Sequence, residues 1–162
     1  MPTPVITAST RYFNPGVTKC YYLPTLASSS LIPTRAEMSS GTDLSPEIAD
    51  LSGWTVTGEV IDTPDLASTF TGQIAGRTSA EDSELTLHAS ITGVDGRALL
   101  PRGATGYIMW CDGGDVPGRK ADVFPILVRS VGQMRSVGDE NARLQIQFSV
   151  TRVPAESITI PA

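Results

Sequence analysis

Apolar and polar side chains alternate most regularly near the C-terminus of the chain. Between residues 142 and 151 every second side chain is apolar, namely Ala142, Leu144, Ile146, Phe148 and Val150. A period of two predicts a β-strand with one buried face. A second long apolar run spans residues 122–135, and the polar cluster at 136–140 is typical of a turn. We therefore expect a long antiparallel hairpin in this part of the chain.

Further strands are predicted where short runs of β-branched, aromatic or alternating residues lie between turn signals. These runs span residues 17–23, 54–61, 69–77, 84–92 and 106–111, with a weaker one at 34–38. The runs at 54–61 and 69–77 are expected to pair through a turn at 62–65. Gly72 and Gly76 in the later run indicate a bulge or a close backbone approach.

Helix signals are confined to two short stretches. Ser45 is a suitable N-cap and Pro46 suits the first helical position, so we expect a helical turn from residue 46 to about residue 51. Asp95 is a suitable cap for a second turn that continues through Leu99. Both stretches are too short to change the fold class.

The 162 residues fit a single domain. Only 18% of them are charged, and glycine, proline, serine and threonine are abundant, which favours a turn-rich, all-β fold. Residues 1–16 and 152–162 are rich in proline and are expected to be extended arms. Residues 39–53 are polar and acidic, and we interpret them as a long loop around the first helical turn.

Negative charge is concentrated in the first half of the chain. The formal net charge is −5, and ten acidic residues accompany a single arginine between residues 37 and 84. This distribution argues against a nucleic-acid-binding surface, which would be basic. It suits either a solvated acidic edge or an acidic face that meets another copy. No apolar run approaches the length of a membrane span and no signal peptide is recognised, so synthesis in the cytoplasm is expected.

Cys20 and Cys111 are the only cysteines, and each lies in an apolar, strand-like setting. Two cysteines without the spacing of metal ligands are typical of buried thiols. A disulfide between the two is the alternative.

No motif predicts an enzyme. His88 is the only histidine and lies within a predicted strand, without a partner for metal binding or nucleophilic catalysis. Asp112 and Asp115 flank two glycines but lack the ligand spacing of a calcium loop. The acidic cluster at 81–84 has nothing near it that suggests a pocket able to separate two carboxyl pKa values. We therefore expect no catalytic residue, no cofactor and no bound metal.

Long amphipathic strands and two arms on one small chain indicate assembly. Exposed strand edges are a hazard for a monomer unless another chain covers them. The sequence resembles the major tail tube proteins of long-tailed bacteriophages in five short segments, at residues 51–56, 61–65, 70–77, 83–87 and 102–108. The order of the predicted elements between about residues 50 and 150 resembles that family as well. That family resemblance implies a β-sandwich with one short flanking helix. It also implies hexameric rings, in which one sheet from each copy joins a barrel around the lumen and which stack through the arms and a long loop.

The resemblance further implies a lumen-facing strand side that is polar and not basic, so that DNA slides past without binding. The side chains that fit this description are Thr55, Thr57, Glu59, Gln145, Gln147 and Ser149. Arg143 lies on the same side and fits only if an acid pairs with it. Contacts between subunits and between rings are expected from the arms and the acidic loop, through Arg11, Tyr12, Phe13, Asp43, Glu47, Asp50, Arg152, Ile158 and Ile160.

The same resemblance implies a structural virion protein of the phage tail, whose partners are further copies of itself, a tape measure protein in the lumen, and terminator and baseplate or tip proteins. One alternative is a head-tail connector or tail terminator that stops at a single ring. Another is a monomeric β-sandwich binding module, which would need an exposed aromatic platform. Trp54 and Trp110 lie on apolar strand faces, where burial is expected.

Overall fold

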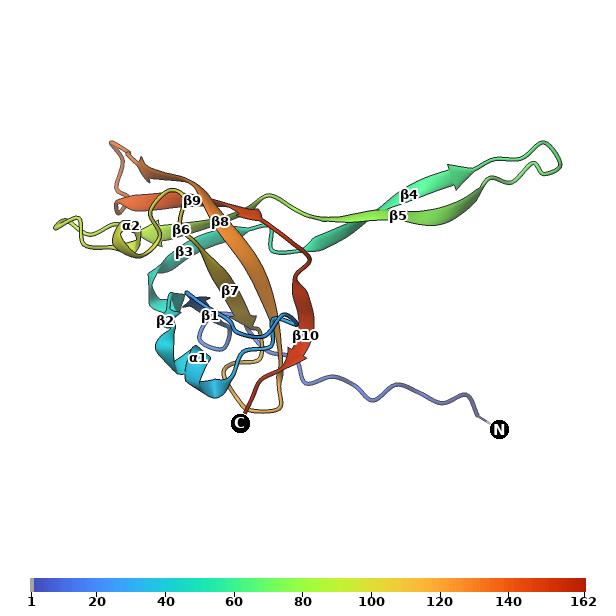
Figure 1. Cartoon of the computed structure of the whole chain (residues 1–162), viewed down its shortest axis with the longest axis horizontal. Coiled ribbons are helices and arrows are strands. Elements are labelled where there is room, and N and C mark those ends of the chain that lie inside the picture. Colours follow the sequence, from blue (N-terminus) through green and yellow to red (C-terminus); the bar gives the residue numbers. More distant parts are fainter. Residues whose placement is uncertain (1) are drawn as a thin grey trace.

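The computed structural model describes residues 2–162, which form ten strands and three short helices (Figure 1). Eight strands make one antiparallel sheet: β1 (Lys19–Leu23), β2 (Thr42–Asp43), β3 (Ile48–Ser52), β6 (Ser83–His88), β7 (Thr105–Cys111), β8 (Lys120–Met134), β9 (Arg143–Val150) and β10 (Ala155–Thr159). Their order is β2-β1-β7-β8-β9-β6-β3, and β10 also pairs with β8. The predicted all-β class is confirmed. No helix within residues 2–162 is long and apolar enough to cross a membrane.

The predicted C-terminal hairpin is the centre of the sheet. β8 and β9 pair antiparallel, and Leu144, Ile146 and Phe148 are at most 1% exposed, as the alternation predicts. β8 pairs with β7 along one edge, and with β10 and then β9 along the other. Pro125 lies at the changeover between β10 and β9, where its carbonyl accepts a hydrogen bond from the Thr151 N–H (3.1 Å). The N–H that proline lacks would therefore point to the place where pairing with β10 ends and pairing with β9 begins. A proline is tolerated there inside a central strand, because the pairing is already interrupted.

The sheet curls around a hydrophobic core. One buried cluster contains side chains from β1, near one end of the strand order, and from β6, near the other end. Trp54 packs within it, with ring centroids 5.6 Å from Trp110, 5.5 Å from Phe124 and 5.3 Å from Phe148. Such tilted and edge-on pairs are favourable aromatic contacts. The predicted burial of both tryptophans is confirmed.

The helix α1 (Arg35–Ser40) replaces the weak strand expected at 34–38, which was wrong. Thr34 and Glu37 form a capping box: the Thr34 side chain accepts from the Glu37 N–H, and the Glu37 carboxylate accepts from the Thr34 N–H (2.7 Å). The N–H groups of Thr34 and Ala27 hold the pKa of Glu37 below its usual value. The box starts the helix and aims Met38 into the core.

A second buried cluster lies on the other face of the sheet, where side chains of α1 and the C-terminal segment meet strands β7 and β8. Its members include Met38, Met109, Cys111, Val123, Ile158 and Ile160. Cys20 belongs to the first cluster and Cys111 to the second, so the two thiols lie on opposite faces of paired strands. Both are free, which rules out the disulfide.

The strands β4 (Val56–Thr63) and β5 (Gly72–Ala80) pair antiparallel as predicted, but they form a separate two-stranded sheet that projects from the body (Figure 1). The register shifts between Gly58 and Val60, with the extra residue on β5. Gly76 lies at this bulge, where an added Cβ would be 3.2 Å from the Glu59 carbonyl oxygen. The bulge expected at the glycines of this strand is therefore confirmed.

Residues 39–53 are not one loop, and the expected helix from 46 to about 51 was wrong. They contain the end of α1, β2, a single 3₁₀ turn η1 (Ser45–Glu47) and β3. Pro46 does occupy the start of a helical turn. The turn ends at once because Ile48 pairs with Leu87 of β6 and its side chain packs against the first core cluster.

The segment 152–162 is not a free arm, which corrects the prediction from its prolines. β10 pairs with the first half of β8, and Ile158 and Ile160 are 9% and 1% exposed within their own chain. The Ile160 N–H donates to the Arg119 carbonyl (2.8 Å), and its carbonyl accepts from the Gly118 N–H (3.0 Å). The C-terminus is therefore part of the domain core.

The helical turn expected after Asp95 is confirmed as α2 (Gly96–Leu99). Asp95 accepts from the N–H groups of Ser90 and Arg97 and from the Arg97 guanidinium, whose Nη2 lies 2.8 Å from Oδ2. This guanidinium bond and the two backbone bonds lower the pKa of Asp95 to about 2. The strand expected over 84–92 ends earlier, at His88, and Ile91 is exposed in the following turn.

Candidate assembly surface

The polar side of β9 forms a row of uncharged polar side chains on the sheet. Gln145, Gln147 and Ser149 alternate with the buried side chains of the strand and are half-buried. Gln145 Nε2 donates to Glu84 Oε2 (2.9 Å), and Ser130 Oγ donates to Gln147 Oε1 (3.0 Å). These two bonds hold Gln145 and Gln147 in a polar strip, in which Arg143 is the only basic side chain of β9.

The other three residues predicted for the same wall lie elsewhere. Thr57 and Glu59 are on β4 of the projecting hairpin, and Thr55 directly precedes it. All three are exposed, and their hairpin belongs to a different sheet from β9. The structure therefore does not bring the two groups together within one chain, and the position of both groups at a lumen stays a prediction. Arg143, at the end of the β9 row, has its Nε bonded to Asn141 Oδ1 (3.2 Å).

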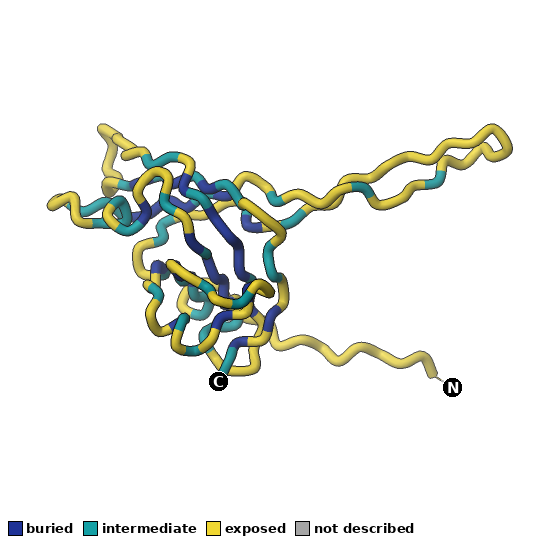
Figure 2. The backbone as a smooth tube through the Cα atoms, viewed as in Figure 1, coloured by how far each residue is buried: buried dark blue, intermediate teal, exposed yellow. Residues whose placement is uncertain are grey.

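The hairpin β4–β5 carries exposed apolar side chains along its length and at its tip. They are Val60, Ile61, Leu66, Phe70 and Ile74. Figure 2 shows the hairpin exposed almost throughout, beyond the buried body of the domain. The sequence predicted the pairing of these strands but not their separation from the core. Large exposed apolar groups on one projection are characteristic of an interaction site.

The segment 2–13 has neither helix nor strand and extends away from the body, as predicted for the N-terminal arm (Figure 1). Tyr12 is 52% exposed and Phe13 is 76% exposed, so neither is anchored on its own domain. Arg11 is exposed beside them. The three predicted arm residues therefore remain available for contacts with another molecule.

The predicted stacking residues of the acidic segment lie on three elements. Asp43 is on β2, Glu47 on η1 and Asp50 on β3, and all three are exposed. Asp43 Oδ2 lies 3.9 Å from Lys19 Nζ and so forms a surface ion pair. The remaining predicted residues are at the C-terminal end, where Arg152 donates to the Tyr107 hydroxyl (3.1 Å). Burial of Ile158 and Ile160 in their own chain excludes them from a stacking surface in this conformation.

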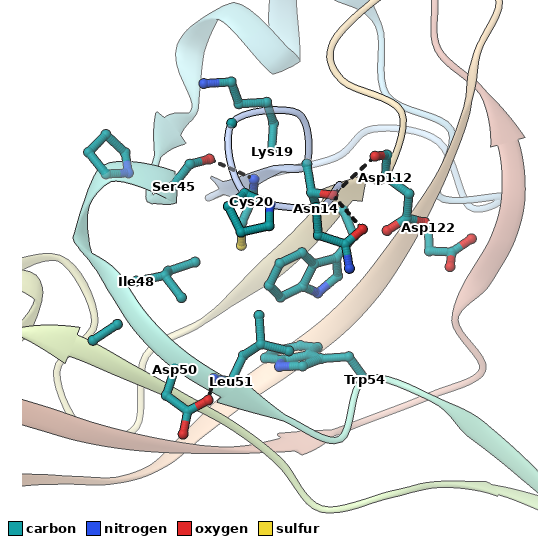
Figure 3. Close-up of a pocket in the computed structure, with 16 residues that line it drawn as sticks. Asn14, Lys19, Cys20, Ser45, Ile48, Asp50, Leu51, Trp54, Asp112 and Asp122 are labelled. Carbon is teal, nitrogen blue, oxygen red and sulfur yellow. Dashed lines mark hydrogen bonds between the residues drawn. The ribbon is translucent and has the colours of Figure 1, made fainter. Parts of the chain in front are cut away.

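A groove of about 610 Å³ opens beside Trp54, between residues 14–16, the segment from η1 to β3, and strands β1, β7 and β8 (Figure 3). Its walls are apolar where Ile48, Leu51 and the two tryptophans contribute. The sequence indicated the apolar residues but not the groove, because its walls come from segments far apart in the chain.

Three carboxylates line the same groove. Asp112 and Asp122 lie together on one side, and Asp50 lies on the opposite side (Figure 3). Burial, and then the nearby charge of Asp122, raise the pKa of Asp112 above its usual value. A site with an aromatic floor and unneutralised carboxylates favours a cationic or aromatic occupant.

The other side chains considered as catalytic or metal-binding candidates have structural partners instead. His88 Nδ1 is bonded to the Asn141 amide (2.5 Å), and Asp115 binds Arg35 Nη1 (2.6 Å). No three His, Cys, Asp or Glu side chains within the described part of the chain gather closely enough to hold a metal ion.

Comparisons with known proteins agree with this geometry. Two solved structures share the fold at 13% sequence identity. One is a chain of the anti-feeding prophage baseplate, six-fold symmetrised, with a TM-score of 0.57 over 94% of this chain and 95% of that one. The other belongs to the anti-feeding prophage cap, a tube-terminating cap, with a TM-score of 0.56 over 94% and 97%. No curated protein sequence matches. The model of the family described as phage tail tube protein matches residues 7–162. The chain belongs to the phage tail tube protein family.

Proposed function

We propose that this phage tail protein is the tube subunit itself, which self-assembles into stacked hexameric rings and forms a conduit for DNA. The observation that carries the proposal is the projecting β4–β5 hairpin with its exposed apolar side chains. A monomer gains nothing from holding Leu66 and Phe70 in water, whereas burying each against a neighbour is worth roughly 1.5–3 kcal/mol. The similar baseplate chain comes from a six-fold symmetrised assembly, which supports the ring.

The β9 row is the part of the surface best suited to line the lumen. Gln145, Gln147 and Ser149 are uncharged, and Gln145 is bonded to an acidic side chain, Glu84. Nonspecific DNA binding depends on lysine and arginine contacts to phosphates. A wall of this composition lets DNA pass without holding it, and the net charge of −5 acts in the same direction.

In the virion the partners that follow from this role are further copies of the chain, a tape measure protein inside the lumen, a terminator at one end and baseplate or tip proteins at the other. The subunit is made in the host cytoplasm and becomes part of the tail. Assembly itself is its function, and it needs no cofactor.

The test uses full-length protein, seeded with tail fragments sheared from virions, and follows growth by electron microscopy and sedimentation. Leu66→Asp at the hairpin tip should prevent elongation, because the charge would be buried at the contact. Val137→Asp is the matched control, since Val137 is equally exposed in the turn after β8. Unimpaired tubes from Leu66→Asp would contradict the proposal.

A single terminating ring is the second candidate function. It is favoured by one observation, the fold shared with the tube-terminating cap. A terminator should form one ring and stop on the seed, whereas a tube subunit should lengthen it. The same micrographs distinguish the two, because seeds grow in one case only.

A further inference from the structure

The groove beside Trp54 and the N-terminal arm are complementary and unused within one chain. We infer that the groove is the receptor for residues 11–13 from the arm of a second copy. The inference rests on the proposed assembly and names one of its contacts.

The three carboxylates of the groove have no cationic partner among residues 2–162. Four ion pairs are found among residues 2–162, and their acidic members are Asp43, Asp82, Asp95 and Asp115. None of the three groove carboxylates belongs to this set. Lys19 lines the groove but forms its ion pair with Asp43. A guanidinium entering here would meet carboxylates and indole faces together, which is the arrangement that favours arginine.

The arm supplies the matching chemistry. Arg11 is the only charged side chain between residues 2 and 13, and Tyr12 and Phe13 follow it in exposed positions. Two aromatic side chains next to an arginine are the residue types most enriched at the centres of protein interfaces.

The occupant comes from another copy because of how the arm leaves the domain. Asn14, Pro15 and Gly16 themselves line the groove. The N–H groups of Val17 and Thr18 both donate to the Asn14 carbonyl (3.1 and 2.9 Å), which fixes the turn after the arm. Own residues 11–13 would have to reverse direction within one residue of this turn to enter the groove. The extended arm spans roughly 40 Å, which is long enough to reach a neighbouring subunit.

The other exposed apolar segment is a poorer occupant. The hairpin tip carries Asp62 and Asp65 beside Leu66 and Phe70 and has no basic side chain between them. Placing these acids against Asp112 and Asp122 would be repulsive. Charge therefore distinguishes the arm from the hairpin as the partner of this groove.

Disulfide cross-linking between different chains tests the contact. Full-length Phe13→Cys protein is mixed with isotope-labelled Asp50→Cys protein during assembly, and heterodimers are identified by mass. The native thiols are buried and do not interfere. A heterodimer is expected from this pair and not from the control pair Leu66→Cys with Asp50→Cys. Equal yields from both pairs would overturn the inference. A double variant that cross-links only within single chains would also overturn it.

Charge reversal gives an independent test. Arg11→Glu should lower the heterodimer yield about tenfold or more, because a charge-assisted contact is lost. Adding Asp112→Arg to the Asp50→Cys partner chain, at another carboxylate of the groove, should restore part of the yield. Arg11 is exposed, so neither the fold nor its unfolding midpoint should change. An Arg11→Glu protein that cross-links as well as the parent would overturn the inference.

Tryptophan fluorescence reports on the same groove, since Trp54 and Trp110 are the only tryptophans and both line it. Assembly should shift their emission in the parent protein but not in Arg11→Glu. If tubes grow in the microscope while Arg11→Glu behaves as the parent, the arm contact is wrong and the tube function stands. If the cross-link forms without tubes, the arm contact stands and the tube function fails.

Discussion

Deletion of residues 155–162 is the sharpest test of the fold, because the same residues look dispensable in the sequence. The deletion removes β10 from the edge of β8 and takes Ile158 and Ile160 out of the second core cluster. Burying each isoleucine is worth roughly 1.5–3 kcal/mol, so about 3–6 kcal/mol is lost before the backbone hydrogen bonds are counted. Small domains have a total unfolding free energy of about 5–15 kcal/mol. The truncated chain should therefore lose a large part of its unfolding free energy, and its urea midpoint should fall steeply.

Urea unfolding followed by tryptophan fluorescence measures the effect. Both indoles are buried in the core, so their emission reports on the folded state. Deletion of residues 2–10 is the matched control, because this exposed segment is of similar length and should leave the midpoint unchanged. Ile160→Ala should lower the unfolding free energy by about 2–5 kcal/mol, and Val153→Ala, at an exposed site, by very little. An unchanged midpoint after the C-terminal deletion would refute the assignment of β10 to the core.

Three further outcomes follow from local contacts. Thr34→Ala removes the α1 cap and should lower the unfolding free energy by about 1 kcal/mol. Thr25→Ala, in a loop, should leave the unfolding free energy unchanged. Equal urea midpoints for the two variants would contradict the capping role of Thr34. The pKa of Asp95 is lowered to about 2, so the ionised side chain stabilises the folded state above its ordinary pKa, and this stabilisation is lost as the pH falls from about 4 to 2. Asp95→Asn should therefore make the unfolding free energy depend less on pH over that interval. An unchanged slope in the variant would argue against this role of Asp95. Burial raises the pKa of Cys111 to about 12 and that of Cys20 above its usual value. Neither thiol should therefore react with Ellman's reagent at pH 8 unless urea is present. Fast labelling of the folded protein would contradict the burial of the thiols.

The sequence predicted those elements whose pattern is long enough to be unambiguous. The alternation in β9 gave its buried and polar faces, and the turn after Asp95 followed from its capping side chain. The β4–β5 pairing was also visible, but alternation reports only that a strand has an apolar face. It does not say which molecule covers that face, so a projecting hairpin and a core hairpin look the same.

The missed elements depend on partners that are distant in the chain. β3 and β10 are five residues each, too short to identify without the neighbouring strands β6 and β8. The Thr34 and Glu37 capping pair was available as a signal for α1, but the run of serines after it weakened the helical pattern. The groove could not be predicted at all, since its walls come from the arm turn, the η1–β3 segment and three strands.

The central claim is that one copy is incomplete and that identical neighbours complete it. Cryo-electron microscopy of tubes grown from the full-length protein tests this most directly. The reconstruction should show rings of six copies, with each β4–β5 hairpin packed against another subunit and the Gln145 and Gln147 side chains facing the lumen. Rings or tubes in which the hairpins remain in solvent would contradict the claim, as would seeded preparations that contain only monomers.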